Sequence, residues 1–172
     1  MSSTVIIIPS RLQAQRLPDK PLKLVNQKEM ILHVYDLAIR SSIGEVLVVT
    51  PDKAIFELIE NYGGKSFLSK DFHETGTDRV FEGFNKFFSN KPEFIINLQG
   101  DMPNLNAKDI IKLKDYLNKK KCDIATLAST LENELEVNDK NIVKVITKES
   151  IKNSDFFEAI DFKREDAVEE SK

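Results

Sequence analysis

The chain has 172 residues and a formal net charge of −3, with 41% hydrophobic and 31% charged residues. This size suits one folded domain with its own core, and the slightly negative charge argues against a nucleic-acid-binding surface. The only cysteine, Cys122, excludes an internal disulfide, favours a reducing, cytoplasmic location and is expected to be buried. The first apolar run is too short for a signal peptide or a membrane span.

The apolar run Val5–Ile8 predicts a strand buried on both faces, as found in parallel sheets. Pro9 ends this run, and the loop that follows carries three cations, Arg11, Arg16 and Lys20. Because α/β folds bind ligands beyond the carboxyl ends of their strands, the loop predicts a site for a polyanion such as a nucleoside triphosphate. The alternative is an ordinary solvated basic loop.

Strand and helix patterns then alternate along the chain. We expect helices at Met30–Ser41, Ala54–Tyr62, Val80–Phe88 and from Asn106 to about Leu117. We expect strands at Val46–Thr50, Ser66–Leu68, Phe94–Leu98, Ile124–Ala128 and Ile142–Ile146. These repeated units predict a three-layer α/β, Rossmann-like fold with a mainly parallel sheet.

The pattern ends near residue 147, so we expect a domain over 1–147 and an irregular polar tail over 148–172. A tail rich in charge is typical of a frayed terminus. The alternative is the start of a loop that leads to further structure.

The segment from His73 to Arg79 lies between an expected strand and an expected helix. Thr77 or Asp78 is expected to cap this helix. Arg79 would oppose the helix dipole in the first turn, which predicts a carboxylate or phosphate partner for it. Gly76 would let a ligand approach the backbone closely. His73 taken alone is more typical of a surface group than of a ligand-binding group.

A third candidate site follows the strand that ends near Leu98. Gly100 would turn the chain off the strand and place Asp101 opposite the first loop. One carboxylate without a nearby histidine or cysteine cluster fits Mg²⁺, which takes few protein oxygens together with substrate phosphates. Gln99 has a donor and an acceptor, which suits the edge of a base or a sugar hydroxyl. The alternative is an aspartate that closes a turn.

Together these segments resemble the 3-deoxy-manno-octulosonate (Kdo) cytidylyltransferases, also called CMP-Kdo synthetases, from the first strand to about Thr147. The matching motifs lie, in chain order, at Pro9–Leu22, Asn26–Val34, Gly63–Gly64, His73–Arg79, Asn97–Pro103 and Asn141–Val145. The family has the nucleotidyltransferase α/β fold and usually works as a homodimer. The resemblance implies that CTP and Kdo react to give CMP-Kdo and pyrophosphate for lipopolysaccharide biosynthesis, without nucleic acid or membrane as partner.

The same resemblance implies roles for the candidate residues. Arg11 and Lys20 would be the catalytic cations that hold the triphosphate and stabilise the departing pyrophosphate, and Arg16 would assist them or meet the anionic sugar. Asp101 would bind Mg²⁺. The remaining residues would surround the cytidine: His73, Gly76, Thr77, Arg79 and Gln99.

The chain departs from the family pattern in two loop positions and in its later part. Asp19 and Gln27 stand where the family has glycine, although aspartate tolerates left-handed backbone geometry better than most residues. The family's later motifs, including a second metal-binding aspartate, are absent after Val145. We therefore expect a truncated member that releases little pyrophosphate by itself. The alternatives are a cytidylyltransferase for another acidic sugar, such as 8-amino-Kdo or a nonulosonate, and a CTP-binding remnant without turnover.

Overall fold

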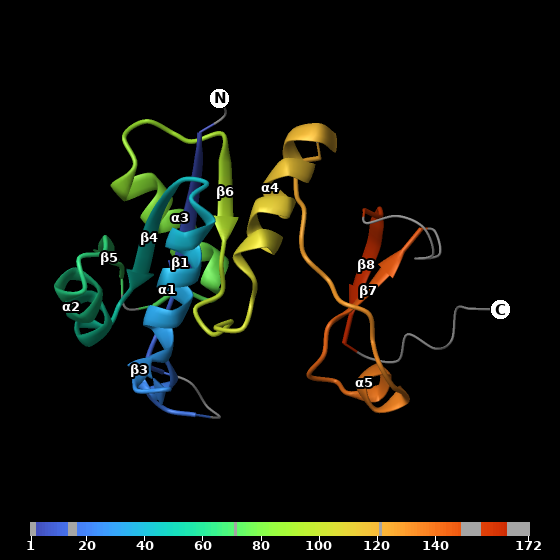
Figure 1. The fold of residues 1–172 in the computed structure, drawn as a ribbon, viewed down its shortest axis with the longest axis horizontal. Helices are drawn as coiled ribbons and strands as arrows, with labels where there is room; N and C mark the ends of the chain where they lie inside the picture. Colours follow the sequence, from blue (N-terminus) through green and yellow to red (C-terminus); the bar gives the residue numbers. More distant parts are fainter. Residues whose placement is uncertain (1–2, 14–16, 71, 121, 149–155, 165–172) are drawn as a thin grey trace. The chain divides into compact units, whose positions relative to one another are not determined.

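A computed structural model describes residues 3–13, 17–70, 72–120, 122–148 and 156–164 (Figure 1). The chain divides into two compact units, Met1–Asp115 and Tyr116–Lys172. Each unit is described by itself. The division falls within the last of the alternating elements, the helix Ala107–Lys120, whereas the sequence pattern places a boundary near residue 147.

The first unit is built on a four-stranded parallel sheet with the order β5-β4-β1-β6 (Figure 1). Its strands are β1 (Thr4–Pro9), β4 (Glu45–Thr50), β5 (Ser66–Leu68) and β6 (Phe94–Asn97). The central strand β1 is buried over its whole length, as its apolar sequence predicts. Since all four strands run in the same direction, their carboxyl ends lie at one edge of the sheet, and the loops that follow them meet there.

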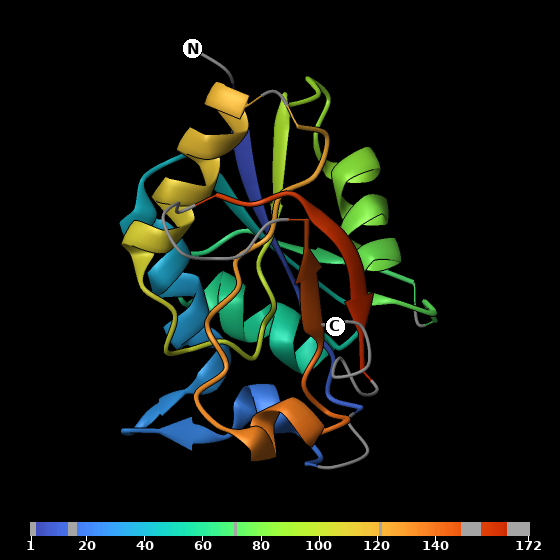
Figure 2. The ribbon, with the colours of Figure 1, turned by 90° about the vertical axis from the view of Figure 1, so that its right-hand side faces the viewer.

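Helices cover both faces of this sheet (Figure 2). They are α1 (Met30–Ser41), α2 (Lys53–Asn61), α3 (Gly76–Phe87) and α4 (Ala107–Lys120). Alternate β1 side chains enter two cores: Ile6 and Ile8 pack with residues of α1, α2 and α4, whereas Val5 and Ile7 pack with residues of α3. The predicted three-layer α/β fold with a mainly parallel sheet is therefore confirmed.

The connection from β1 to α1 contains a short 3₁₀ helix, η1 (Lys20–Leu22), and a small hairpin of β2 (Leu24–Val25) and β3 (Lys28–Glu29). The two residues at the hairpin turn, Asn26 and Gln27, have φ values of 49° and 65°. Positive φ at both positions is the geometry of a type I′ turn, which asparagine tolerates and which favours glycine at the second position. Gln27 is therefore strained where a glycine would be relaxed.

The second unit contains helix α5 (Glu134–Asn138) and two antiparallel strands, β7 (Lys144–Thr147) and β8 (Ala159–Lys163). Much of its apolar surface is exposed, including Ile124, Leu135 and Ile160. No described helix of the chain has the length and apolar character needed to cross a membrane.

Most predicted elements of the first unit are confirmed within a few residues, but four expectations in the second unit are wrong. Ile124–Ala128 is not a strand, since no described strand pairs with it and Ile124 is 87% exposed. The strand expected at Ile142–Ile146 forms as β7, but it pairs with β8 rather than with the parallel sheet. The expected irregular tail contains β8, and the thiol of Cys122 is only partly buried.

Candidate active site

The candidate residues lie in the loops that leave the carboxyl edge of the parallel sheet. Arg11 and Lys20 follow β1, the segment from His73 to Arg79 follows β5, and Gln99 and Asp101 follow β6. Three separate segments of the sequence therefore converge on one edge of the first unit, as the sequence predicts. Arg16 lies outside the described residues.

The loop after β1 is anchored to its neighbours through Leu12. The backbone N–H of Leu12 donates to Oδ2 of Asp52 at 2.8 Å, and the backbone N–H of Asp19 donates to the carbonyl of Leu12 at 3.2 Å. Next to it, the N–H of Ser10 donates to the carbonyl of Val49 at 3.0 Å, which continues the pairing of β1 with β4. The described parts of this loop, at Leu12 and at Asp19, are thus held by hydrogen bonds, although Arg11 itself is exposed.

Lys20 and Asp101 form an ion pair, with Nζ 2.9 Å from Oδ2, across 81 residues of sequence. Lys20 opens η1, and the preceding Asp19 adopts a left-handed conformation with φ of 54°. Asp19 therefore adopts left-handed backbone geometry at the position where the family has glycine, as expected for an aspartate. The structure thus brings together the two groups assigned to the triphosphate and to the metal.

Arg79 is buried, with 3% of its surface exposed, although a guanidinium is costly to remove from water. Its Nε donates to Oγ of Ser69 at 3.4 Å. Burial lowers the pKa of Arg79, and the positive charge of Arg11 acts in the same direction, whereas the negative charges of Asp52 and Glu82 oppose the shift. The Ser69 hydroxyl is therefore a hydrogen-bond partner of the Arg79 guanidinium, and the carboxylates of Asp52 and Glu82 add favourable negative charge.

His73 belongs to a second anchored loop. Its Nε2 lies 2.9 Å from Oε2 of Glu82, an α3 residue, and the same oxygen accepts the backbone N–H of Lys70 at 3.1 Å. Nδ1 of His73 is buried without a hydrogen-bond partner among the described residues. The histidine is thus turned toward α3 and holds the loop, rather than standing free at the surface.

The cap of α3 lies before both expected positions, Thr77 and Asp78. Thr75, not Thr77, is the N-cap: its Oγ1 accepts the N–H of Asp78 at 3.1 Å, and Asp78 accepts the N–H of Thr75 at 3.0 Å. This reciprocal capping box satisfies two helix-terminal donors. The hydrogen bonds from Thr75 lower the pKa of Asp78. Thr77 is exposed in the first turn.

Gly76 and Gln99 lie together beside the end of β1. A side-chain carbon on Gly76 would come within 3.6 Å of the Pro9 ring and 4.0 Å of Oε1 of Gln99. Gly100 lies still closer to β1, because a side-chain carbon there would come within 2.9 Å of the Pro9 carbonyl. The amide of Gln99 donates to Asn97 at 3.0 Å. The segments after β5 and β6 therefore meet at Pro9.

One carboxylate at this edge, that of Asp101, is of a kind that suits a magnesium ion bound partly by substrate phosphate. The carboxylate of Asp101 is 55% exposed and is a hard oxygen ligand. No group of three or more histidine, cysteine, aspartate or glutamate side chains suited to a metal occurs among the described residues. Mg²⁺ commonly takes one or two carboxylates plus substrate phosphates, so Asp101 fits that role and does not form a complete protein cage.

Sequence reasoning missed Asp52 and Glu82, the two carboxylates that hold the loops. Asp52 follows β4 in the same way as Asp101 follows β6, so its position at a strand's carboxyl end was the available signal. Glu82 gave no such signal, because it lies in the middle of α3 and its role depends on a loop folding back onto the helix.

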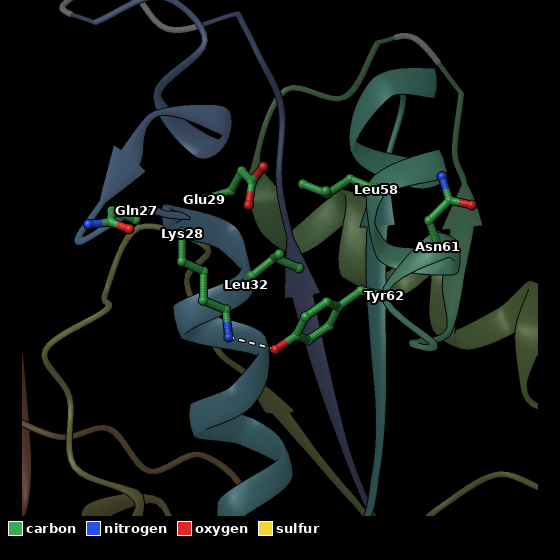
Figure 3. A pocket seen from close by; sticks show the side chains of 7 residues that line it. All are labelled: Gln27, Lys28, Glu29, Leu32, Leu58, Asn61 and Tyr62. Atoms are coloured by element: carbon green, nitrogen blue, oxygen red, sulfur yellow. Dashed lines mark hydrogen bonds between the residues drawn. The ribbon is translucent and has the colours of Figure 1, made fainter.

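A hollow of about 470 Å³ lies apart from these residues, between the β2–β3 hairpin, α1 and α2 (Figure 3). Its lining residues are Gln27, Lys28, Glu29, Leu32, Leu58, Asn61 and Tyr62. Burial acts to lower the pKa of Lys28, but hydrogen bonds to Asp36 and Tyr62 outweigh it and raise that pKa. Because the ammonium of Lys28 already has partners in the protein, it is not a free anion-binding group.

Comparison with known proteins agrees with this placement. The family model described as cytidylyltransferase matches residues 5–169. The 3-deoxy-manno-octulosonate cytidylyltransferase of Wigglesworthia glossinidia brevipalpis is 38% identical over 142 residues, and that of Thermodesulfovibrio yellowstonii is 37% identical over 149 residues. Each alignment covers 83% of this chain and 58% of the relative. The chain thus spans less than two thirds of the length of these relatives.

Solved structures show the same fold. A CMP:2-keto-3-deoxy-manno-octonic acid synthetase complexed with CTP superimposes with a TM-score of 0.79 and 30% identity, over 95% of this chain and 65% of that chain. A cytidylyltransferase from Leptospira borgpetersenii, at 19% identity, has a TM-score of 0.57 over 70% of this chain and 51% of its own, which shows the fold alone. The chain therefore belongs to the cytidylyltransferase family and resembles its Kdo-activating members over most of its length.

Proposed function

We propose that this chain provides the CTP-binding part of a Kdo cytidylyltransferase. The single observation that carries the proposal is the meeting of Lys20 and Asp101 at the carboxyl edge of the sheet, in a chain of the cytidylyltransferase family. A cation and a hard oxygen ligand placed side by side suit a metal-bound triphosphate. The names of the relatives support CTP and Kdo as the substrates.

In the proposed reaction the anomeric hydroxyl of Kdo attacks the α-phosphorus of CTP, loses its proton, and displaces pyrophosphate. Such transfers depend mainly on positioning and on neutralising the phosphate charge, so no nucleophilic side chain is required. Lys20 and Arg11 would bind the phosphates and stabilise the charge that develops on the leaving pyrophosphate. Magnesium, when bound at Asp101, would neutralise the phosphates further.

The base and the sugar would be bound by other groups of the same edge. Gly76 and Gln99, which lie beside Pro9, would contact the cytosine or its ribose, and buried Arg79 would add positive potential next to Arg11. The proposal also includes a cytoplasmic place in lipopolysaccharide synthesis and a homodimer for the full-length family member.

Calorimetric titration of the chain with CTP, UTP and ATP, each with Mg²⁺, tests nucleotide selectivity. We expect CTP to bind most tightly, and equal affinity for ATP would contradict the assignment. A hybrid that joins this chain to the part of a relative that it does not match tests the reaction. We expect the hybrid to release pyrophosphate from CTP only when Kdo is added, and 8-amino-Kdo and a nonulosonate serve as competing sugars.

A further inference from the structure

We propose that Asp52 is a positioning residue: through its hydrogen bond to Leu12 it holds the segment that follows β1, and it thereby directs Arg11 toward the bound anion. This inference rests on the proposed function, since it concerns the same site. Asp52 is not one of the groups expected to touch nucleotide, sugar or metal.

The first step is that Asp52 stands where a helix cap is expected and does not act as one. It is the N-cap residue of α2, and aspartate at this position normally accepts an N–H of its own helix. Here its side chain makes no capping hydrogen bond. The carboxylate instead reaches 40 residues back along the sequence to the N–H of Leu12, at 2.8 Å.

The second step is that this contact controls the direction of Arg11. The N–H of Leu12 and the carbonyl of Arg11 belong to one planar peptide group. A carboxylate that holds the N–H therefore fixes the plane of that group and limits the directions open to the Arg11 side chain. The carbonyl of Leu12 accepts the N–H of Asp19, so Leu12 also holds the residue that precedes Lys20.

The third step concerns charge. Burial lowers the pKa of Arg79, the positive charge of Arg11 lowers it further, and the negative charge of Asp52 opposes the shift. Without that carboxylate, the exposed Arg11 would be free to move away from Arg79 toward solvent. Asp52 thus contributes both a hydrogen bond and a compensating charge.

The test measures the affinity of the 172-residue chain for tripolyphosphate, without divalent metal and at fixed ionic strength, by calorimetry. In Asp52→Ser, the hydroxyl is one bond shorter than a carboxylate oxygen and does not reach Leu12, yet serine caps α2 well. We expect about a tenfold loss of tripolyphosphate affinity, because a misdirected Arg11 no longer makes its charge-assisted hydrogen bond to the phosphate. The melting temperature should be unchanged or higher, because serine caps α2. Asp52→Asn keeps a hydrogen-bond acceptor without the charge, and its tripolyphosphate affinity is expected to lie between those of Asp52→Ser and the wild type.

Glu57→Gln is the matched control, because it removes an exposed carboxylate from the same helix and should leave tripolyphosphate affinity unchanged. A double-mutant cycle with Arg11→Ala separates positioning from general stability. If Asp52 acts through Arg11, Asp52→Ser should cost about twofold or less in the Arg11→Ala background, whereas independent sites would give additive losses. If the serine variant fails to fold, Asp52→Asn is used in the same cycle.

Additive losses, an unchanged affinity in the folded Asp52 variants, or no tripolyphosphate binding by the wild type would overturn the inference. Failure of the proposed function gives a different result. If the chain prefers ATP to CTP while the Asp52 and Arg11 losses remain coupled, the assignment to cytidylyl transfer fails and the positioning role stands.

Discussion

The two compact units of this chain differ in how far they bury their apolar side chains. In the first unit every residue of β1 is buried, and its alternate side chains fill two cores between helices. In the second unit four of the five residues of β8 are exposed, and Ile124 and Leu135 are exposed to 87% and 83%. The apolar run of β1 is therefore buried as a whole, whereas many apolar side chains of the second unit are exposed.

The comparison teaches that an apolar pattern predicts structure well where strands and helices alternate and pack on one shared sheet. In the first unit each strand is followed by a helix that packs against the same sheet, so local periodicity and tertiary packing agree. In the second unit the two described strands pair only with each other. The following experiments test this difference and the assignment of anion binding to the first unit.

The largest effect is expected from paired truncations of isoleucine. Ile7→Ala removes a fully buried side chain from β1 and should lower the free energy of unfolding by about 2–5 kcal/mol. Ile124→Ala removes an exposed side chain and should change it by about 0.5 kcal/mol or less. Urea denaturation monitored by circular dichroism measures both, and comparable losses would show that the second unit buries Ile124.

The next effect concerns Lys20, in the segment between β1 and α1. Lys20→Ala should lower CTP affinity at least about tenfold, since loss of a charge-assisted contact costs about 1.5–3 kcal/mol. Lys23→Ala, an exposed lysine just beyond η1, is the control and should bind CTP like the wild type. Calorimetry that gives equal affinities for wild type and Lys20→Ala would remove Lys20 from the site.

The variant Asp101→Asn distinguishes a metal-binding role of Asp101 from a structural role in the turn. If Asp101 binds Mg²⁺, the variant should lose most of the increase in CTP affinity that Mg²⁺ produces. Its stability should fall by no more than about 1 kcal/mol, because the ion pair with Lys20 is solvent-exposed. Melting curves with and without CTP and Mg²⁺ distinguish this outcome from a lower melting temperature with the metal effect intact.

The smallest effect is expected at the hairpin turn before α1. Gln27→Gly should raise the free energy of unfolding by about 0.5–1 kcal/mol, because relief of the positive φ outweighs the greater freedom of glycine in the unfolded chain. Gln27→Ala keeps the strain and should bring no comparable gain. Thermal denaturation of the two variants side by side gives the answer, and a gain in both would point to a cause other than the turn.

The sequence carried enough information to predict the four strands of the parallel sheet, the four helices around it and the three segments that meet at its carboxyl edge. The Val5–Ile8 run, the helix Met30–Ser41 and the strand Ser66–Leu68 were predictable because their spacing and their burial coincide. The cap of α3 was placed wrongly, since both Thr75 and Thr77 are chemically able to cap and only the backbone geometry selects between them.

The supporting contacts of the site could not be predicted in the same way. Asp52 and Leu12 lie 40 residues apart, and the pair of His73 and Glu82 depends on a loop that folds back onto α3. Likewise Ile124–Ala128 has the composition of a strand, but a strand also requires a partner, which composition does not specify.

The ion pair between Lys20 and Asp101 has a consequence for how strongly metal and nucleotide affect each other's binding. A free metal ion would have to compete with the Lys20 ammonium for Asp101, and a free triphosphate would have to compete with Asp101 for Lys20. A metal–nucleotide complex offers each residue a new partner in the same event. Metal and nucleotide would therefore be positively linked ligands, each raising the affinity for the other, and added salt would weaken the linkage because the pair is exposed to solvent.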